Sequence, residues 1–224
     1  SIIQTVTDTV LGLIPDLVGG TAVSTATATV TIGEGTLIEA TTLDLQADAR
    51  TTAKVNASWL PLAVAVGVST PTATVTVESG VQITTTGNLS ISAVADSTID
   101  LTAQHGFGPG SSTKLSEFLQ PIDVTVAVGV ANATATAQVF GGSTLTAGGN
   151  LNVSADILKY QSVSTNAGAF GAGKLAVAVS VSTFNADATA TLEGTITAGK
   201  NITVQGSLIS EKNFAGAGAS VGDG

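Results

Sequence analysis

One sequence pattern occurs four times in this chain of 224 residues, and it restricts the possible folds more than any other feature. Each copy has an alternating segment rich in Thr, Ala and Val, a glycine-containing turn, a short alternating segment, a second turn and a segment that begins with Leu or Ile. The first segments of the four copies are Val23–Ile32, Val68–Val77, Val130–Val139 and Val181–Leu192. A period of roughly 45 to 60 residues is typical of solenoids and other repeat arrays.

Residues within each repeat alternate with a period of two, as half-buried β-strands do. Ala63–Val68 alternates small with β-branched residues, and Thr72–Val77 alternates hydroxyl with apolar residues. Glu, Lys and Arg, which favour helices, are scarce, so we expect an all-β protein with strands of about five to seven residues. We expect a glycine turn after each first segment, at Gly33 and Gly35, at Gly80, at Gly141 and Gly142, and at Gly194. Positive-φ turns are expected at the Gly-Gly pairs 141–142 and 148–149 and at Thr-Gly-Asn 86–88.

Two all-β architectures are compatible with this pattern. A string of immunoglobulin-like sandwiches would need about 100 residues per unit, which is more than one repeat provides. We therefore expect a right-handed parallel β-helix, or β-solenoid, of about four degenerate repeats, each supplying two or more coils of about 20 residues. About 11 coils at a strand spacing of about 4.8 Å would form a rod roughly 50 Å long. The predicted units of this single array are approximately 1–58, 59–122, 123–174 and 175–224.

An insertion at 105–121 departs from the simple repeat. Ser112 or Thr113 is placed to cap a short helix that ends before Pro121. Thr7–Val18 is interpreted as a similar element. Short loop or helix insertions of this kind are expected on one face of a solenoid.

The alternation also predicts the core. We expect the branched apolar residues of each repeat to point inward, because they have the largest apolar surface to bury. The predicted core residues are Val64, Val66, Val75, Val77, Ile83, Leu89, Ile91, Val126, Val128, Val139, Leu145, Leu151, Val153, Val177, Val179, Leu192, Ile196, Ile202 and Val204.

Charge and composition exclude several classes of protein. A formal net charge of -9 and a pI near 4.2 oppose nucleic-acid binding, which requires Lys and Arg to replace the counterions of phosphates. Cysteine is absent, which excludes disulfides, thiolate catalysis and Cys-ligated metals. No apolar run is long enough to span a bilayer as a helix.

The second turn of the repeat carries a family resemblance. Gly87–Ala93 and Gly149–Ala155 both read Gly-Asn-Leu-x-Ile/Val-x-Ala, and Ala-Val-Ala-Val-x-Val occurs at Ala63–Val68 and Ala176–Val181. These segments resemble the repeats of giant bacterial surface adhesins, the filamentous-haemagglutinin-like and leukotoxin-type filamentous adhesins. The resemblance implies a parallel β-helix at the cell surface or in an extracellular matrix. There it would serve adhesion, with cell-surface glycans as partners, or scaffolding as in a biofilm.

The sequence offers little for catalysis, and we expect a protein that is not an enzyme. His105 is the only histidine and lies in a Gly-rich region with no indicated serine or carboxylate partner. Asp48, Asp96 and Asp156 follow Ala at the expected ends of similar strands. Carboxylates at such turns could bind Ca²⁺, although solvated turn residues are the simpler interpretation, and no other cofactor is expected.

The Thr-x-Thr motifs suggest a second class of function. They recur at Thr27, Thr29, Thr72, Thr74, Thr134, Thr136, Thr189 and Thr191. On a flat solenoid face such a ladder would resemble an ice-binding surface, although Thr is also a common outward strand residue. A polysaccharide-binding module is a further alternative, for which Trp59 and Tyr160 supply the large polar aromatic rings.

The two ends of the sequence predict assembly. Ser1–Thr5 reads like the close of a repeat and Phe214–Gly218 like the opening of one. We therefore expect Ser1–Thr7 and Phe214–Gly224 at opposite ends of the array, in register with identical or adjacent repeat units stacked head to tail. The main functional hypothesis is an extracellular structural or adhesive segment that forms a rod or filament.

Overall fold

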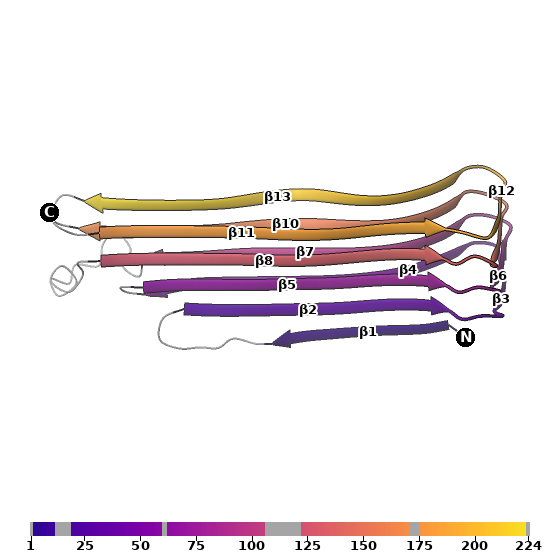
Figure 1. Cartoon of the computed structure of the whole chain (residues 1–224), viewed down its shortest axis with the longest axis horizontal. Helices are drawn as coiled ribbons and strands as arrows, with labels where there is room; N and C mark the ends of the chain where they lie inside the picture. The colour runs from indigo at the N-terminus through magenta and orange to yellow at the C-terminus, as the bar shows by residue number, and fades with distance from the viewer. Residues whose placement is uncertain (1, 12–18, 60–61, 106–121, 171–174, 223–224) are drawn as a thin grey trace.

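All regular structure in the described residues is β-strand. The computed structural model describes residues 2–11, 19–59, 62–105, 122–170 and 175–222 (Figure 1). Sheet A contains β1 (Ile2–Leu11), β2 (Gly19–Ile32), β5 (Leu62–Val77), β8 (Ile122–Val139) and β11 (Leu175–Leu192). Sheet B contains β3 (Leu37–Ala40), β6 (Gln82–Thr85), β9 (Thr144–Ala147) and β12 (Thr195–Ala198). Sheet C contains β4 (Leu43–Trp59), β7 (Leu89–His105), β10 (Leu151–Phe170) and β13 (Ile202–Gly222).

Each repeat forms one coil. The chain runs along a strand of sheet A, turns through a short strand of sheet B and returns along a strand of sheet C (Figure 1). Equivalent strands of successive coils pair in parallel, with equivalent residues side by side, so that Thr27 is next to Thr72 and Thr72 is next to Thr134. The predicted parallel β-helix is therefore confirmed, with four coils stacked in sequence order.

The coils are fewer and much larger than predicted. Long strands of 14 to 21 residues replace the expected strands of about five to seven residues, so that a repeat makes one coil and not two or more. Four strands at about 4.8 Å stack to only about 19 Å, whereas the 17 residues of β4 extend over about 56 Å. The molecule is a slab with its long dimension perpendicular to the stacking axis. The prediction failed because nothing ends the alternation in β5, where even Pro71 is tolerated by omitting the pairs of Thr70 and Pro71 with β8.

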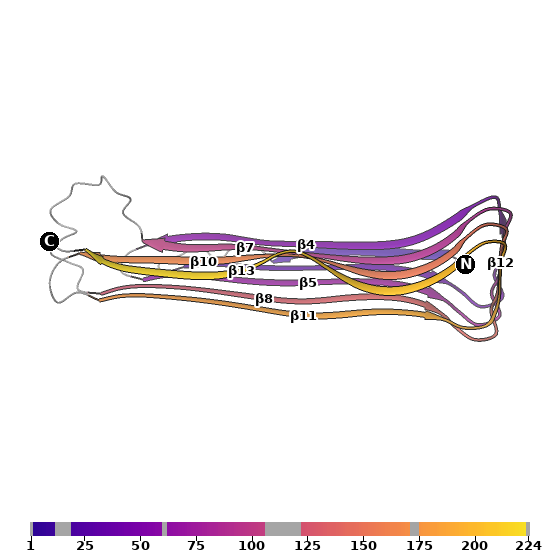
Figure 2. The same ribbon diagram turned by 90° about the horizontal axis from the view of Figure 1, so that it is seen from above.

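Sheets A and C face each other, and sheet B joins them at one end (Figure 2). Near sheet B the space between the two long sheets is filled by large side chains such as Ile83 and Leu89. Farther along the strands the inward residues are mostly Ala, including Ala73 and Ala95. The backbones come very close where glycine is present, because a Cβ on Gly206 of β13 would lie 2.5 Å from the carbonyl oxygen of Ala188 in β11. Short side chains therefore define the thickness of the slab.

The predicted core was correct for the half of each coil next to sheet B. Nine of the predicted residues are fully buried there, namely Val75, Val77, Ile83, Leu89, Ile91, Val139, Leu145, Leu151 and Val153. In the other half of sheet A the strand face was wrong, and the small residues point inward while the valines point outward, namely Val64, Val66, Val126, Val128, Val177 and Val179. Sheet C supplies the large side chains in this half, and a Cβ on Gly67 would lie 2.7 Å from Leu101 Cδ2. There is no room for inward valines on the facing strand.

The last coil keeps the strand pairing of the others, but nothing among the described residues covers its outer edge. The side chains of Leu192 and Ile196 are partly buried, and those of Ile202 and Val204 are exposed. Their equivalents in the preceding coil, including Leu151 and Val153, are fully buried. These residues occupy core positions whose covering layer is absent.

A polar layer divides the core into two apolar clusters. The hydroxyl oxygen of Ser69 lies 2.5 Å from that of Thr51 and 2.7 Å from that of Ser97, which links sheet A to two strands of sheet C. Gln161 Nε2 donates to the carbonyl oxygens of Gly129 and Thr183, so β10 is also bonded across the slab to β8 and β11. Buried hydroxyls that are paired in this way fix the register of the facing sheets.

The first turn of each repeat contains a glycine with positive φ; the prediction of positive φ is confirmed for Gly142 and was wrong for Gly141. The φ angles are 72° at Gly35, 73° at Gly80, 86° at Gly142 and 105° at Gly194. The second turn uses glycine for a different reason, since Gly87, Gly148 and Gly149 are not among the positive-φ glycines. A Cβ on Gly148 would overlap the carbonyl oxygen of Thr86 in the preceding coil. Close stacking of the turns, and not backbone conformation, requires glycine there.

The N-terminal strand departs from the prediction. β1 runs antiparallel to β2 at the edge of sheet A, with Ile2 opposite Ile32 and Leu11 opposite Val23. β1 is therefore not the end of a preceding repeat, because the last strand of a repeat lies in sheet C. Its residues 7–11 belong to this strand and do not form an insertion. β1 and β13 nevertheless belong to opposite ends of the stack (Figure 1). The predicted insertion at 105–121 lies outside the described residues apart from His105, whose backbone ends β7.

Truncation of a core residue should report the difference between covered and uncovered coils. Ile91→Ala should reduce the free energy of unfolding by about 2–5 kcal/mol, because Ile91 is fully buried in the second coil. Val204→Ala, in the same inward row on β13, should cause a clearly smaller loss in dilute solution, since Val204 is 45% exposed. Denaturant unfolding monitored by circular dichroism measures both. Equal losses would mean that the last coil is covered in the isolated chain.

Candidate functional site

The outer face of sheet A carries the predicted threonine ladder. Thr27, Thr72 and Thr134 form one row across the strands, and their neighbour in β11 is Asp187. The next row consists of threonine alone, namely Thr29, Thr74, Thr136 and Thr189. Thr191 lies one row farther, beside Gln138, because the fourth copy of the repeat is two residues longer before its turn. The ladder is thus a flat array of hydroxyl and methyl groups, displaced by one row in the last strand.

The other half of the same face is apolar. The valines that were expected in the core form rows here, such as Val66 with Val128 and Val68 with Val130. Towards the connections between coils, Ile122 and Leu175 are 47% and 52% exposed. Apolar side chains that are regularly spaced on an open sheet face are typical of surfaces that contact another body.

The outer face of sheet C is polar and charged, and it contains the three candidate calcium ligands. Asp48, Asp96 and Asp156 lie within long strands and not at strand ends as expected, since β4, β7 and β10 continue well beyond them. Asp48 forms an ion pair with Arg50 at 2.8 Å, and Asp156 accepts a hydrogen bond from Ser207. Within the described part of the chain, no three His, Asp or Glu side chains come together in a group that could hold a metal ion.

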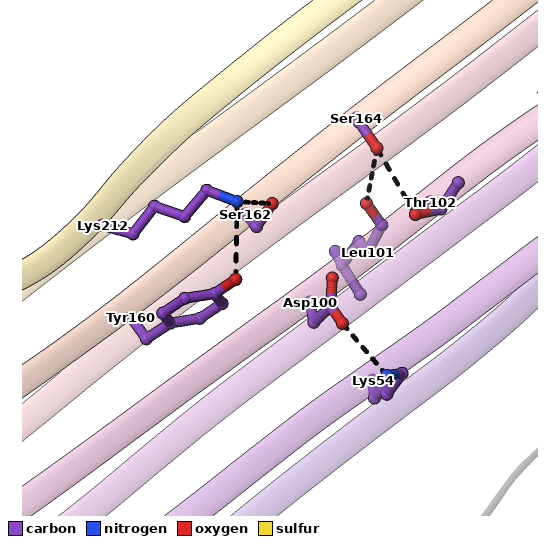
Figure 3. Close-up of polar contacts among 8 residues, drawn as sticks. All are labelled: Lys54, Asp100, Leu101, Thr102, Tyr160, Ser162, Ser164 and Lys212. Atoms are coloured by element: carbon purple, nitrogen blue, oxygen red, sulfur yellow. Dashed lines mark hydrogen bonds and ion pairs between the residues drawn. The ribbon is translucent and has the colours of Figure 1, made fainter.

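A shallow depression of about 410 Å³ lies on this face. Lys54 Nζ forms an ion pair with Asp100 at 3.2 Å, and Lys212 Nζ donates to the hydroxyl oxygens of Tyr160 and Ser162 at 3.4 and 3.0 Å (Figure 3). The lining residues are Thr52, Lys54, Asp96, Thr98, Asp100, Leu158, Lys159, Tyr160 and Glu211. Acceptors, donors and one aromatic ring are thus open to solvent together, which suits weak contacts with a polar polymer better than chemistry on a small molecule.

Among the carboxyl groups that line this depression, Asp96 is the one whose pKa is shifted by its environment. Partial burial raises the pKa of Asp96, and the attraction of Arg50 offsets this only in part. In the strand register, Asp96 lies between Arg50 of β4 and Leu158 of β10. The carboxylate form of Asp96 is therefore less stable in the folded protein than in solution.

The depression was not found from the sequence. Its lining residues Lys54 and Asp100 are adjacent on β4 and β7, beside Ser162 of β10, and Tyr160 lies between Thr98 and Lys212 in the neighbouring row. These alignments follow directly from the repeat if one coil per repeat is assumed, whereas coils of about 20 residues would insert further coils between these residues, so that they would not be neighbours. The side chains of the other two candidates, Trp59 and His105, lie outside the described residues.

Comparisons with family models, curated proteins and solved structures give no match to this chain. The described residues contain no helix with the length and apolar character needed to cross a membrane. The resemblance to adhesin repeats therefore stays a prediction.

The pKa of Asp96 predicts a pH dependence of stability. Because the folded-state pKa lies above the unfolded value of about 3.9, the folded state binds more protons between the two, and stability should fall as pH rises through this window. Asp96→Asn should abolish that fall, so that the variant gains stability relative to the native protein between pH 3 and pH 7. Denaturant midpoints measured across this range test the prediction. Thr98→Asn, on the same strand and face, is the uncharged control, and a similar gain in this variant would contradict the assignment.

Proposed function

We propose that this chain is a structural segment of an extracellular β-solenoid that stacks end to end with neighbouring units to form a rod or filament. The observation that carries the proposal is the uncovered core of the last coil. Ile202, Val204 and Leu208 are 50%, 45% and 51% exposed, whereas Leu151, Val153 and Ile157, their partners in the preceding coil, are fully buried.

Backbone and side chains both favour a further coil on this end. β11, β12 and β13 are the last strands of their sheets, so each presents a free edge that can pair with another strand. Burial of apolar side chains at the same edge would add to the backbone hydrogen bonds. An added coil, from an adjacent repeat of a longer polypeptide or from an identical chain, would extend all three sheets at once.

The opposite end constrains how a neighbour arrives. β3 and β4 end their sheets there, but β1 occupies the edge of β2 over ten residue pairs. Complete continuation of all three sheets at this end requires β1 to leave that edge. The two ends of the stack therefore differ, so that stacking has a direction: the C-terminal end is open, and the N-terminal end is covered in sheet A.

The charged face of sheet C suits adhesion or matrix contact at the cell surface. Its depression presents Tyr160, Lys54 and Glu211 to solvent on a chain with a net charge of -9. Hydroxyl-rich polymers such as surface polysaccharides can stack on an aromatic ring and hydrogen-bond to such groups. Repetition of the same face along a filament would multiply weak contacts by avidity.

Ice binding is a second candidate, and the alignment of the threonine rows favours it. Thr29, Thr74, Thr136 and Thr189 form a continuous row on the outer face of a flat sheet. An ice-binding chain would shape ice crystals as a monomer, and this activity would be lost on replacing Thr74 by a bulky residue. Absence of ice shaping at micromolar protein would remove this candidate.

Substitutions on β13 test the stacking proposal. Val204→Asp with Leu208→Asp places two charges where the next coil would bury them, so end-to-end association should weaken at least tenfold, by the free energy of burying an unpaired charge. Thr203→Asp with Gln205→Asp changes the same strand by the same charge on the outward face, beside Asn152 and Ser154, and it should leave association unchanged. Sedimentation velocity over a range of concentrations, with electron microscopy of the fibres, measures both. Equal assembly of the two variants would refute stacking through this edge.

A further inference from the structure

We propose that the outer face of sheet A is an interface between two copies of this chain, which pack face to face through their long sheets. This interaction is separate from end-to-end stacking, since it uses the flat side of the slab and not the edges of its last coil. The argument rests on the charge, size and symmetry of the face.

The part of this face that β2, β5, β8 and β11 form is almost free of charge in an acidic protein. β2 and β5 contain no charged residue, Asp123 of β8 is buried between the sheets, and Asp187 of β11 is the only charged residue that these four strands turn outward. The strands of sheet C, by contrast, carry Asp, Glu, Lys and Arg side chains on their outer face. Depletion of charge with retention of apolar and hydroxyl groups is typical of the centre of an interface.

The face is large enough for a stable dimer. The 16 residues of β5 extend over about 53 Å, and four strands span about 19 Å, which gives a flat area of about 1,000 Å². A specific interface of standard size buries about 800 Å² on each partner. Rows of valine and threonine also have the shape that two packed sheets require, since their short side chains can interdigitate at a sheet separation of about 10 Å.

Self-complementarity selects one arrangement. A two-fold axis parallel to the strands places the apolar half of one face on the apolar half of the other and reverses the strand order, so that β5 faces β8 and β11 faces β2 of the second copy. Asp187 then lies over the part of β2 that holds Thr27, whose hydroxyl can donate to it, and the two Asp187 carboxylates remain apart. A two-fold axis perpendicular to the strands would instead place the valines of one copy over the threonines of the other. It would also place β11 over β11, which brings the two Asp187 carboxylates nearer to each other.

The experiment separates this interface from stacking. The full chain carrying Val204→Asp and Leu208→Asp (the edge variant) stacks through β13 at least tenfold more weakly, and at concentrations where stacking is lost we expect it to remain a dimer in sedimentation equilibrium. Adding Val66→Lys and Val128→Lys, which are neighbours at the centre of the face, should weaken the dimer at least a hundredfold. Val94→Lys replaces a half-buried outward valine on sheet C, and it should leave the dimer intact. Circular dichroism confirms that each variant is folded.

Two results would overturn the proposal. If the outer face of sheet A does not bind a second copy, the chain with Val204→Asp and Leu208→Asp would remain monomeric up to high micromolar concentration. If the dimer formed through another surface, Val66→Lys with Val128→Lys would leave it intact. A monomeric edge variant that shapes ice would assign the face to ice. The symmetry has its own test, because a short bismaleimide linker should join chains with Val66→Cys to chains with Val128→Cys more efficiently than it joins either variant to itself.

Discussion

The close approach of sheets A and C is the constraint on which the rest of the structure depends. In the thin gap between the two sheets, at least one of the facing strands must place Ala, Gly or Ser inward. Larger side chains fit only where the residues on the opposite strand are small or where sheet B holds the two long sheets farther apart. Close packing of short side chains gives many dispersion contacts over a long strand, and the bonded layer of Thr51, Ser69 and Ser97 holds the sheets in register. Long flat coils are the result.

The same constraint distributes chemistry over the surface. Because valine does not fit inside the narrow half of sheet A, it is turned outward and makes that face apolar. The charges are left to sheet C and the turns, where Lys54 with Asp100 and Arg50 with Asp48 form exposed ion pairs that add little stability. One slab therefore has an apolar and hydroxyl-rich face, a polar and charged face, and an edge where core residues are uncovered.

Local features were predictable from the sequence, and long-range ones were not. The positive-φ turns at Gly35 and Gly142 follow from glycine at fixed places in the repeat, and the burial of Val75 and Ile91 follows from the alternation. An alternation of period two has two possible faces, however, and the choice for Ala65 and Val66 depends on Leu101 in a strand far away in sequence. The depression on sheet C depends in the same way on coil length, and the antiparallel pairing of β1 has no sequence signal in the repeat.

The stacking account is tested most directly by fibre diffraction from aligned assemblies of the full chain. If chains stack through the edges of β11, β12 and β13 and β1 leaves the edge of β2, strands lie across the fibre, with a reflection at about 4.8 Å along the axis and a subunit repeat of four strands, about 19 Å. A subunit repeat near 56 Å, the length of a coil, would mean that the slabs join through their ends along the strand direction. That result, or the absence of ordered assemblies, would contradict the account.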